Sequence, residues 1–180
     1  MDCMKVNTTG TANVAIGKAA LDANTTANSN VAIGKLSLTA NTTGAGNTGV
    51  GAETLESNTT GTQNTAVGFQ AAEQNTTASN VTAVGHHALT DNTTGAENAA
   101  FGSFALENNT TGGSNTACGH NAMAANTTAS FNTAMGKNSM EANTTGANNT
   151  AYGRESLASN TTASNNTAIG YNALLVNTTG

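Results

Sequence analysis

Asn7-Thr8-Thr9-Gly10 and Asn13-Val14-Ala15-Ile16-Gly17 are the two stretches on which the fold of this chain depends. Both return along the whole chain in a fixed register. The triplet Asn-Thr-Thr begins every 17 residues, without one insertion or deletion. A fixed period of this size predicts a stacked array of structural repeats. The first residues of these triplets are Asn7, Asn24, Asn41, Asn58, Asn75, Asn92, Asn109, Asn126, Asn143, Asn160 and Asn177.

The period also sets the domain organisation. We expect one repeat array over residues 7–180, in which ten 17-residue repeats fill 7–176 and residues 177–180 open another. Residues 1–6 precede the array and are expected to form an N-terminal leader segment. They lack the apolar core of a secretion signal.

Composition argues against an ordinary globule. Aromatic residues make up 3% of the chain and charged residues 8%, and there is no Trp or Pro. A thick core of large side chains cannot be built from this composition, whereas a thin solenoid needs only a narrow core. Disorder is the alternative for such a polar, low-complexity chain. Disorder predicts drifting repeats, but here small or apolar residues return to the same repeat positions.

The charge of the chain makes some partners unfavourable, and its cysteine content argues against a disulfide-stabilised fold. The net charge is −5, from ten acidic and five basic residues, and no basic patch is visible. Nucleic acid and anionic membranes are therefore poor partners. No apolar run approaches the roughly 20 residues that span a bilayer, so we expect no membrane insertion. Cys3 and Cys118 are too few for a disulfide framework.

The repeat positions, counted from 0 at the first Asn, have distinct characters. Positions 1 and 2 are Thr and position 3 is Gly or Ala, while position 6 is Asn except for Val81 and position 8 is Ala except for Gly49. Position 9 is apolar but variable in size. Position 10 is always glycine: Gly17, Gly34, Gly51, Gly68, Gly85, Gly102, Gly119, Gly136, Gly153 and Gly170. Position 14 is leucine in seven repeats: Leu21, Leu38, Leu55, Leu89, Leu106, Leu157 and Leu174.

This pattern predicts an all-β parallel solenoid. Helices are disfavoured, because glycine costs about 1 kcal/mol inside a helix and Asn-Thr-Thr is a poor helix former. We expect one short strand at positions 6–9 and a second at about 12–15. Glycine at position 10 and Gly or Ala at position 3 would form corners that need positive φ or close backbone approach. Turns stacked about 4.8 Å apart would give a rod roughly 48 Å long.

Stacking in register explains why positions repeat. The residues of one position lie above each other, so Ala at position 8 and Leu at position 14 would form continuous interior ladders. Asn at positions 0 and 6 would form side-chain amide ladders. The variable size at position 9 indicates a roomier place, such as a second layer or a subunit interface.

The motifs Asn-Val-Ala-Ile-Gly-Lys-Ala-Ala (13–20) and Asn-Val-Ala-Ile-Gly-Lys-Leu-Ser (30–37) resemble a known repeat. They are similar to the head repeats of trimeric autotransporter adhesins of the YadA type, and the Asn-Thr-Ala-x-Gly arrays resemble segments of phage tail-fibre proteins. The resemblance covers positions 6–14. It implies a left-handed parallel β-roll, three chains side by side, and a surface-exposed adhesive or fibre protein. The family's commonest head repeat is shorter, and its stalk and membrane anchor are not found in this sequence.

Every Asn-Thr-Thr is also an N-glycosylation acceptor pattern, so the eleven asparagines named above are candidate glycosylation sites. Asn80, Asn108, Asn148 and Asn165 begin four further acceptor motifs. The alternative is that Asn and Thr serve the turn and the ladder, and that the acceptor motif is a by-product. Glycosylation would place a row of sugars along one edge of the rod.

No catalytic, metal or cofactor site is expected. His86 and His120 share position 11 but lie two turns apart, about 9.6 Å, which is too far for one metal ion. Glu56 and Glu73 are neighbours at position 15, but nothing else converges on them. Phosphate-binding loops, nucleophile elbows and Cys-x-x-Cys motifs are absent, so the sequence indicates no enzyme and no cofactor.

The sequence therefore predicts a structural rod in an extracellular, cell-surface or virion fibre, whose variable positions 4, 5, 11 and 12 offer loops for weak, multivalent contacts. The expected partner is the chain itself, as a homotrimer or an end-to-end filament, with a host-surface receptor or glycan as a further partner. A self-assembling, glycosylated filament subunit is one alternative. An ice-binding solenoid is another, although Thr8 and Thr9 are adjacent and would point to opposite sides of a strand.

Overall fold

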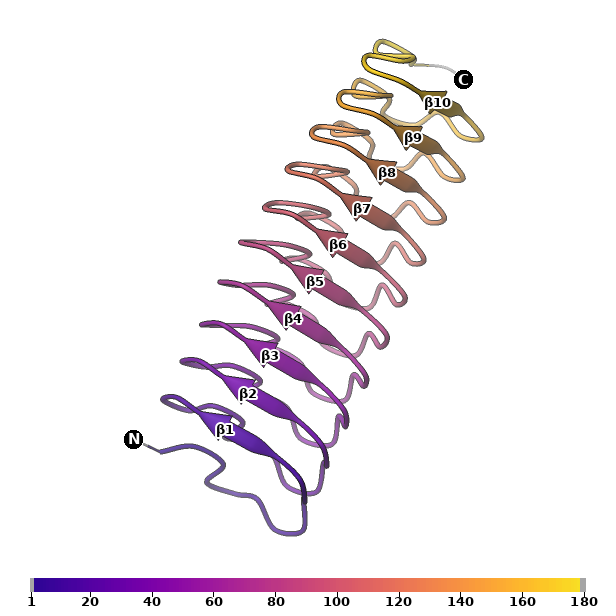
Figure 1. Cartoon of the computed structure of the whole chain (residues 1–180). Coiled ribbons are helices and arrows are strands. Elements are labelled where there is room, and N and C mark those ends of the chain that lie inside the picture. Colours follow the sequence, from indigo (N-terminus) through magenta and orange to yellow (C-terminus); the bar gives the residue numbers. More distant parts are fainter. Residues whose placement is uncertain (1, 179–180) are drawn as a thin grey trace.

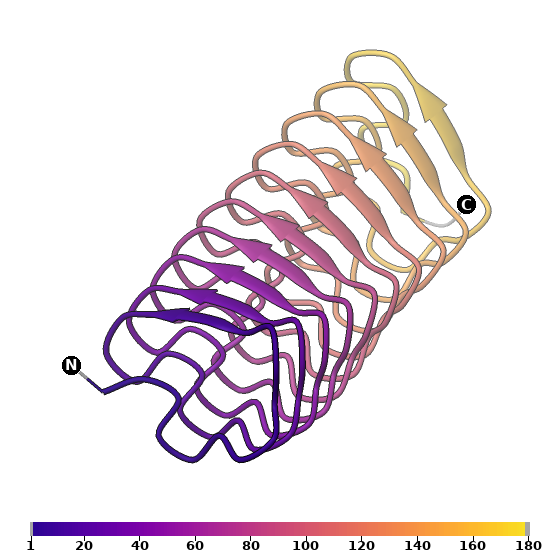
Figure 2. The same cartoon turned by 60° about the horizontal axis from the view of Figure 1, so that its bottom comes forward.

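The structure, a computed structural model, describes residues 2–178 and confirms the all-β parallel solenoid. One three-residue strand from each repeat joins a single ten-stranded parallel sheet, whose strands follow chain order from one end of the rod to the other (Figures 1 and 2). The strands are β1 (Val14–Ile16), β2 (Val31–Ile33), β3 (Thr48–Val50), β4 (Thr65–Val67), β5 (Thr82–Val84), β6 (Ala99–Phe101), β7 (Thr116–Cys118), β8 (Thr133–Met135), β9 (Thr150–Tyr152) and β10 (Thr167–Ile169).

The strand register equals the sequence period. Ala15 pairs with Ala32, and Val84 of β5 pairs with Phe101 of β6, so each residue lies beside the residue 17 positions away. Parallel strands normally need a crossover of a dozen or more residues, and the rest of the 17-residue turn supplies it. A shift of the strand pairing by one residue would turn the alanines of position 8 to the outer face of the sheet. This explains why the repeats contain no insertions.

The second strand that we expected at positions 12–15 is wrong. These residues form a turn, because positions 12 and 14 both have left-handed backbone: φ is 54° at His87 and 56° at Leu89. A β-strand needs negative φ throughout. The turn still makes hydrogen bonds between layers, since the His87 N–H donates to Phe69 O at 3.0 Å in the layer before and the Leu89 N–H to Ala105 O at 2.9 Å in the layer after.

The corner at position 3 has the close backbone approach that the sequence predicted as one of two options, whereas the left-handed backbone lies elsewhere. Position 5, and not position 3, is left-handed in every complete repeat, with φ of 58° at Gln63 and 61° at Phe131. Position 3 instead has close backbone approach: a Cβ on Gly61 would lie 2.2 Å from Ala78 O. Each left-handed non-glycine residue costs about 1 kcal/mol or more, and the stacked layers hold it in place.

The core is a narrow column of alanine and leucine. Ala at position 8, small residues at position 13 and Leu at position 14 are fully buried in the interior repeats, as Ala83, Ala88 and Leu89 illustrate. Of the seven ladder leucines, six are 0% exposed, whereas Leu174 in the last complete repeat is 49% exposed. At the other end, Cys3 and Met4 pack against this core, and the Met4 N–H donates to Ala20 O at 3.1 Å.

Gly49, the single exception to Ala at position 8, is explained by its neighbours. The hydroxyls of Ser37 and Thr54 lie 2.8 Å apart in the core, and Ser37 Oγ also donates to Gly49 O at 3.2 Å. A Cβ on residue 49 would lie 2.5 Å from Ser37 Oγ. The hydroxyl pair therefore occupies the space that an alanine methyl fills in other repeats.

Truncating the leucine ladder should destabilise the rod. We expect Leu106→Ala to lower the free energy of unfolding by about 2–5 kcal/mol, because it empties a fully buried site between two turns. Urea unfolding followed by circular dichroism measures the loss. Leu174→Ala is the matched control and should cost less than about 1 kcal/mol, since that side chain is half exposed. Equal losses in the two variants would contradict a packed ladder.

Candidate functional site

The asparagines at position 0 form a buried hydrogen-bonded ladder. Asn92 Nδ2 donates to Asn75 Oδ1 in the preceding turn at 2.9 Å and to Gly95 O in its own turn at 3.0 Å. The same two donations recur in most turns. Nine members are 0% exposed: Asn24, Asn41, Asn58, Asn75, Asn92, Asn109, Asn126, Asn143 and Asn160.

This burial bears directly on the candidate glycosylation sites. A sugar is attached to Nδ2, which in these nine asparagines is buried and donates hydrogen bonds inside the coil. The folded rod therefore offers no row of sugars at position 0, and the geometry favours the turn-and-ladder interpretation. Asn7 and Asn177, at the two ends, are half-buried. By contrast, Asn80, Asn148 and Asn165 at position 5 are exposed, as is Asn108 at position 16.

A second asparagine ladder runs at position 6, beside the first. The Asn47 N–H donates to Asn30 Oδ1 at 2.8 Å, and Asn47 Nδ2 donates to Gly61 O at 2.8 Å. Val81 interrupts this ladder. Its backbone N–H donates to Asn64 Oδ1 in the preceding turn at 3.0 Å, but its side chain has no oxygen that could accept from the Asn98 N–H in the following turn.

Restoring the ladder should stabilise the rod. We expect Val81→Asn to raise the free energy of unfolding by about 1 kcal/mol, because the new carboxamide can accept from the Asn98 N–H and donate to Gly95 O. Chemical denaturation of the variant and the parent measures the gain. Val176→Asn is the control, since Val176 is 76% exposed and should show almost no change. Destabilisation by Val81→Asn would mean that desolvation of the carboxamide outweighs the two bonds.

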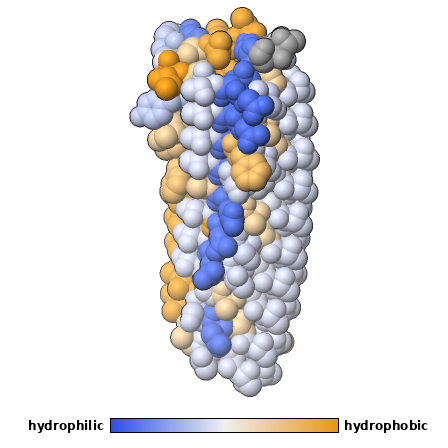
Figure 3. All heavy atoms as spheres, turned by 90° about the vertical axis from the view of Figure 1, so that its right-hand side faces the viewer, coloured by the Kyte–Doolittle hydropathy of each residue, from blue (hydrophilic) through white to orange (hydrophobic). Residues whose placement is uncertain are grey.

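The outer face of the sheet carries an uncharged apolar row at position 9. Alternation along each strand turns position 8 inward and positions 7 and 9 outward. Position 9 is apolar in all ten strands, and apolar side chains gather along one edge of the rod in Figure 3. We name this row the position-9 stripe: Ile16, Ile33, Val50, Val67, Val84, Phe101, Cys118, Met135, Tyr152 and Ile169, of which Val50, Val84 and Cys118 are half-buried and the others exposed.

The threonine columns do not form a flat two-dimensional array. At position 1, the hydroxyl is used within the coil, as in Thr93 Oγ1, which donates to Thr110 O at 3.0 Å. At position 2 every described threonine is exposed, in single file. At position 7 the outward threonines lie beside the uneven stripe, whose members range from Cys118 to Tyr152. This roughness disfavours the flat matching surface that ice binding needs.

Histidines and phenylalanines meet on one edge of the rod, which sequence reasoning missed. His86 and His87 lie between Phe69 and Phe104, with ring centroids 5.3–5.7 Å from the two phenylalanines. His120, two turns above His86, joins this cluster through a ring contact with Phe104, at 5.8 Å. The signal that could have found this cluster is the coincidence of ring residues at positions 11 and 12 in successive repeats.

Acidic residues gather near Glu56. Burial raises its pKa above the usual value, and the negative charges of Glu53 and Glu73 raise it further, while Lys35 opposes them. Lys35 itself pairs with Glu53, at 3.1 Å. The carboxylates of Glu53, Glu56 and Glu73 therefore form a mutually repelling acidic group.

The raised pKa gives a pH-dependent prediction. The folded state binds the Glu56 proton more tightly than the unfolded chain does, so ionisation of Glu56 costs stability as pH rises above the ordinary glutamate pKa of 4.5. We expect Glu56→Gln to raise the melting temperature at pH 7 and leave it unchanged at pH 3. Calorimetry at the two pH values tests this, and a stabilisation that is independent of pH would contradict the electrostatic cause.

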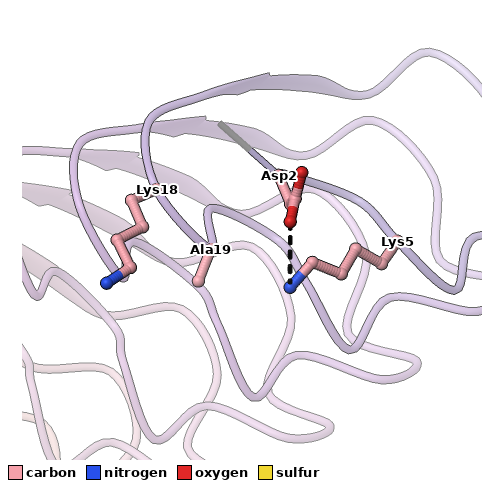
Figure 4. Close-up of a pocket in the computed structure, with 4 residues that line it drawn as sticks. All are labelled: Asp2, Lys5, Lys18 and Ala19. Carbon is pink, nitrogen blue, oxygen red and sulfur yellow. Dashed lines mark ion pairs between the residues drawn. The ribbon is translucent and has the colours of Figure 1, made fainter.

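A small cavity lies at the N-terminal end of the rod (Figure 4). It has a volume of about 310 Å³ and is lined by Asp2, Lys5, Lys18 and Ala19. Lys5 Nζ lies 3.8 Å from Asp2 Oδ2 and 3.5 Å from Asp22 Oδ2, so its charge is already neutralised within the chain. No convergent set of donors or of catalytic groups faces this cavity among the residues drawn.

Residues 2–178 lack two further kinds of functional element. In that part of the chain no helix has the length and apolarity needed to cross a membrane. Within the same range, no three or more His, Cys, Asp or Glu side chains are placed together to hold a metal ion. Comparisons with protein-family models, curated proteins and solved structures found no match to this chain.

Proposed function

We propose that this solenoid is the stiff rod of an extracellular or surface fibre, and that it associates side by side with copies of itself through the position-9 stripe. The observation that supports this function most directly is the stripe itself, which stays apolar and uncharged over all ten strands. Exposed apolar surfaces of this continuity mark interaction sites in soluble proteins. The resemblance of positions 6–14 to adhesin head repeats supports a homotrimer and a surface location.

Stiffness follows from the ladders. Each turn is tied to the next by the sheet, by the two asparagine ladders and by hydrogen bonds from the turn residues, so bending strains several rows at once. Repeat proteins of this kind are quasi-one-dimensional, and each layer contacts only its neighbours. A rod of this construction holds the variable positions 4, 5, 11 and 12 at fixed spacing for multivalent contact with a receptor or glycan, and positions 5 and 11 are exposed in most repeats.

Molecular mass in solution tests the self-association. We expect the purified protein to run as a species of about three chains, each of 17.7 kDa, by light scattering after gel filtration. The double variant Phe101→Glu/Tyr152→Glu places two charges on the stripe and should yield monomers. Phe131→Glu is the matched control: Phe131 is 64% exposed but lies at position 5, so the mass should not change.

Electron microscopy separates the alternatives. Uniform short rods support the fibre-rod proposal, whereas particles that lengthen with concentration support an end-to-end filament. A wild-type protein that stays monomeric at high concentration rejects the lateral association. Thermal hysteresis by that monomer would instead support the ice-binding alternative, which the uneven stripe disfavours.

A further inference from the structure

The imidazole rings of His86 and His87 lie unusually close together for consecutive residues. Their centroids are 4.3 Å apart, at an interplanar angle of 45°. Consecutive side chains of an extended segment point to opposite faces and cannot meet in this way. Here the left-handed backbone at His87, with φ of 54°, turns the chain sharply enough to bring both rings to one edge of the rod. The same corner recurs in every repeat, but only this repeat has histidine at both positions 11 and 12.

This spacing fits two ligands of one metal ion. Transition metals bind imidazole nitrogen at about 2.0–2.1 Å, and the ring centroid lies about 1.1 Å farther out, so two rings at right angles around one ion have centroids about 4.5 Å apart. The observed separation is 4.3 Å. His86 is exposed and His87 is half-buried, so both side chains have room to rotate. Small rotations would point one ring nitrogen of each toward the same ion.

We propose that His86 and His87 together bind one divalent transition-metal ion of the Ni²⁺, Cu²⁺ and Zn²⁺ class. Neutral imidazole suits these ions, whereas Mg²⁺ and Ca²⁺ prefer oxygen ligands. Two side chains are one fewer than the three that catalytic zinc centres use, so water completes the coordination and the ion stays exposed. The proposal is independent of the rod function and concerns a different edge of the coil from the position-9 stripe.

Glu107 is placed to orient one of the two ligands. Its Oε1 lies 3.8 Å from His87 Nδ1, and both side chains are less than one-third exposed. A metal-ligating histidine characteristically donates its other ring N–H to a carboxylate, which fixes the tautomer and the ring orientation. A modest approach of Glu107 would make that bond and leave His87 Nε2 for the ion. Phe69 and Phe104 flank both imidazoles, with ring centroids 5.3–5.7 Å away.

The chain offers a matched set of variants. We expect titration of the full-length protein with Ni²⁺ by calorimetry, at neutral pH, to show one saturable site per chain. Cys3→Ser and Cys118→Ser in the background remove thiol binding. His86→Gln and His87→Gln should each abolish the site, whereas His120→Gln should change the affinity less than twofold, because His120 contacts only Phe104 in this cluster. Mg²⁺ should not bind there.

Glu107→Gln distinguishes an oriented pair from two independent surface histidines. We expect it to weaken Ni²⁺ binding about tenfold. The imidazole ¹⁵N resonances of His86 and His87 should broaden together on addition of Ni²⁺, which tests the site in the unsubstituted protein. Absence of a saturable site, loss of binding in His120→Gln, or unchanged binding in either His86→Gln or His87→Gln would overturn the proposal.

Discussion

Gly85→Ala should lower the free energy of unfolding by about 3–5 kcal/mol. The added Cβ would lie 2.5 Å from Gly102 O and 2.6 Å from Gly102 C in the next layer. Both atoms are backbone and cannot move without disturbing the sheet on either side. The backbone itself also resists, because φ at Gly85 is 143°, outside the region that L-residues adopt.

Two other glycines separate the causes of this loss. Gly170 has a comparable φ of 124° but no atom within 4 Å of its ideal Cβ, so Gly170→Ala measures backbone strain alone. Gly46 has a φ of 71° and no neighbour closer than 3.8 Å, and Asn tolerates this region, so Gly46→Asn should be nearly neutral. Urea unfolding of all three variants, followed by circular dichroism, should rank them in that order.

The position of Gly85 near the middle of the array makes a second signature visible. Solenoid stability is approximately a sum of repeat and nearest-neighbour terms. A weakened interface between two central turns should therefore let the two halves unfold separately, giving a biphasic curve. If Gly85→Ala unfolded in a single transition at the wild-type midpoint, the two layers would be able to move apart at this corner. That result would contradict the close backbone approach in the structure.

The period determined most of what the sequence could predict about the fold. An unbroken 17-residue register places each residue beside its own copy, so the parallel pairing of Ala15 with Ala32 and the buried leucine ladder follow from arithmetic and hydrophobicity. The second strand failed for a local reason. Left-handed backbone is usually indicated by glycine. Positions 12 and 14 instead hold residues such as Phe104 and Leu106, so the residue types did not predict a turn there.

The candidate functional sites were harder to predict from the sequence than the stacking of the turns. The Asn-Thr-Thr motif matches a glycosylation acceptor, yet in the fold Nδ2 donates to the asparagine of the preceding turn, and the motif alone does not decide between these two roles. The histidine pair was missed for the same reason: its rings meet only because His87 has left-handed backbone. Stripe position 9 was expected to be roomy, and its outward direction follows from alternation with the buried Ala at position 8.

Asn92→Asp should destabilise the rod nearly as strongly as the glycine substitution, by about 3–5 kcal/mol at neutral pH. The substitution replaces a donor by an acceptor at a site that is 0% exposed. Asn92 Nδ2 now donates to Asn75 Oδ1 and Gly95 O, and a carboxylate there would face both oxygens without a proton to offer. Asn109 Nδ2 would still donate to the new side chain from above, at about the present 2.8 Å, which is too little to offset the loss.

The pH dependence identifies the cause of that loss. Burial and two facing oxygens should raise the pKa of the aspartate introduced at position 92 in the folded state, relative to about 3.9 in the unfolded chain. Its protonated form can donate one hydrogen bond, so the deficit relative to wild type should be smallest below pH 4. It should then grow by about 1.4 kcal/mol per pH unit until the folded-state pKa is passed. Asn80→Asp, at an exposed position-5 asparagine, should show neither the loss nor the slope. A deficit at position 92 that is independent of pH would mean that the ladder tolerates a charge, and that its asparagines are held by shape rather than by their hydrogen bonds.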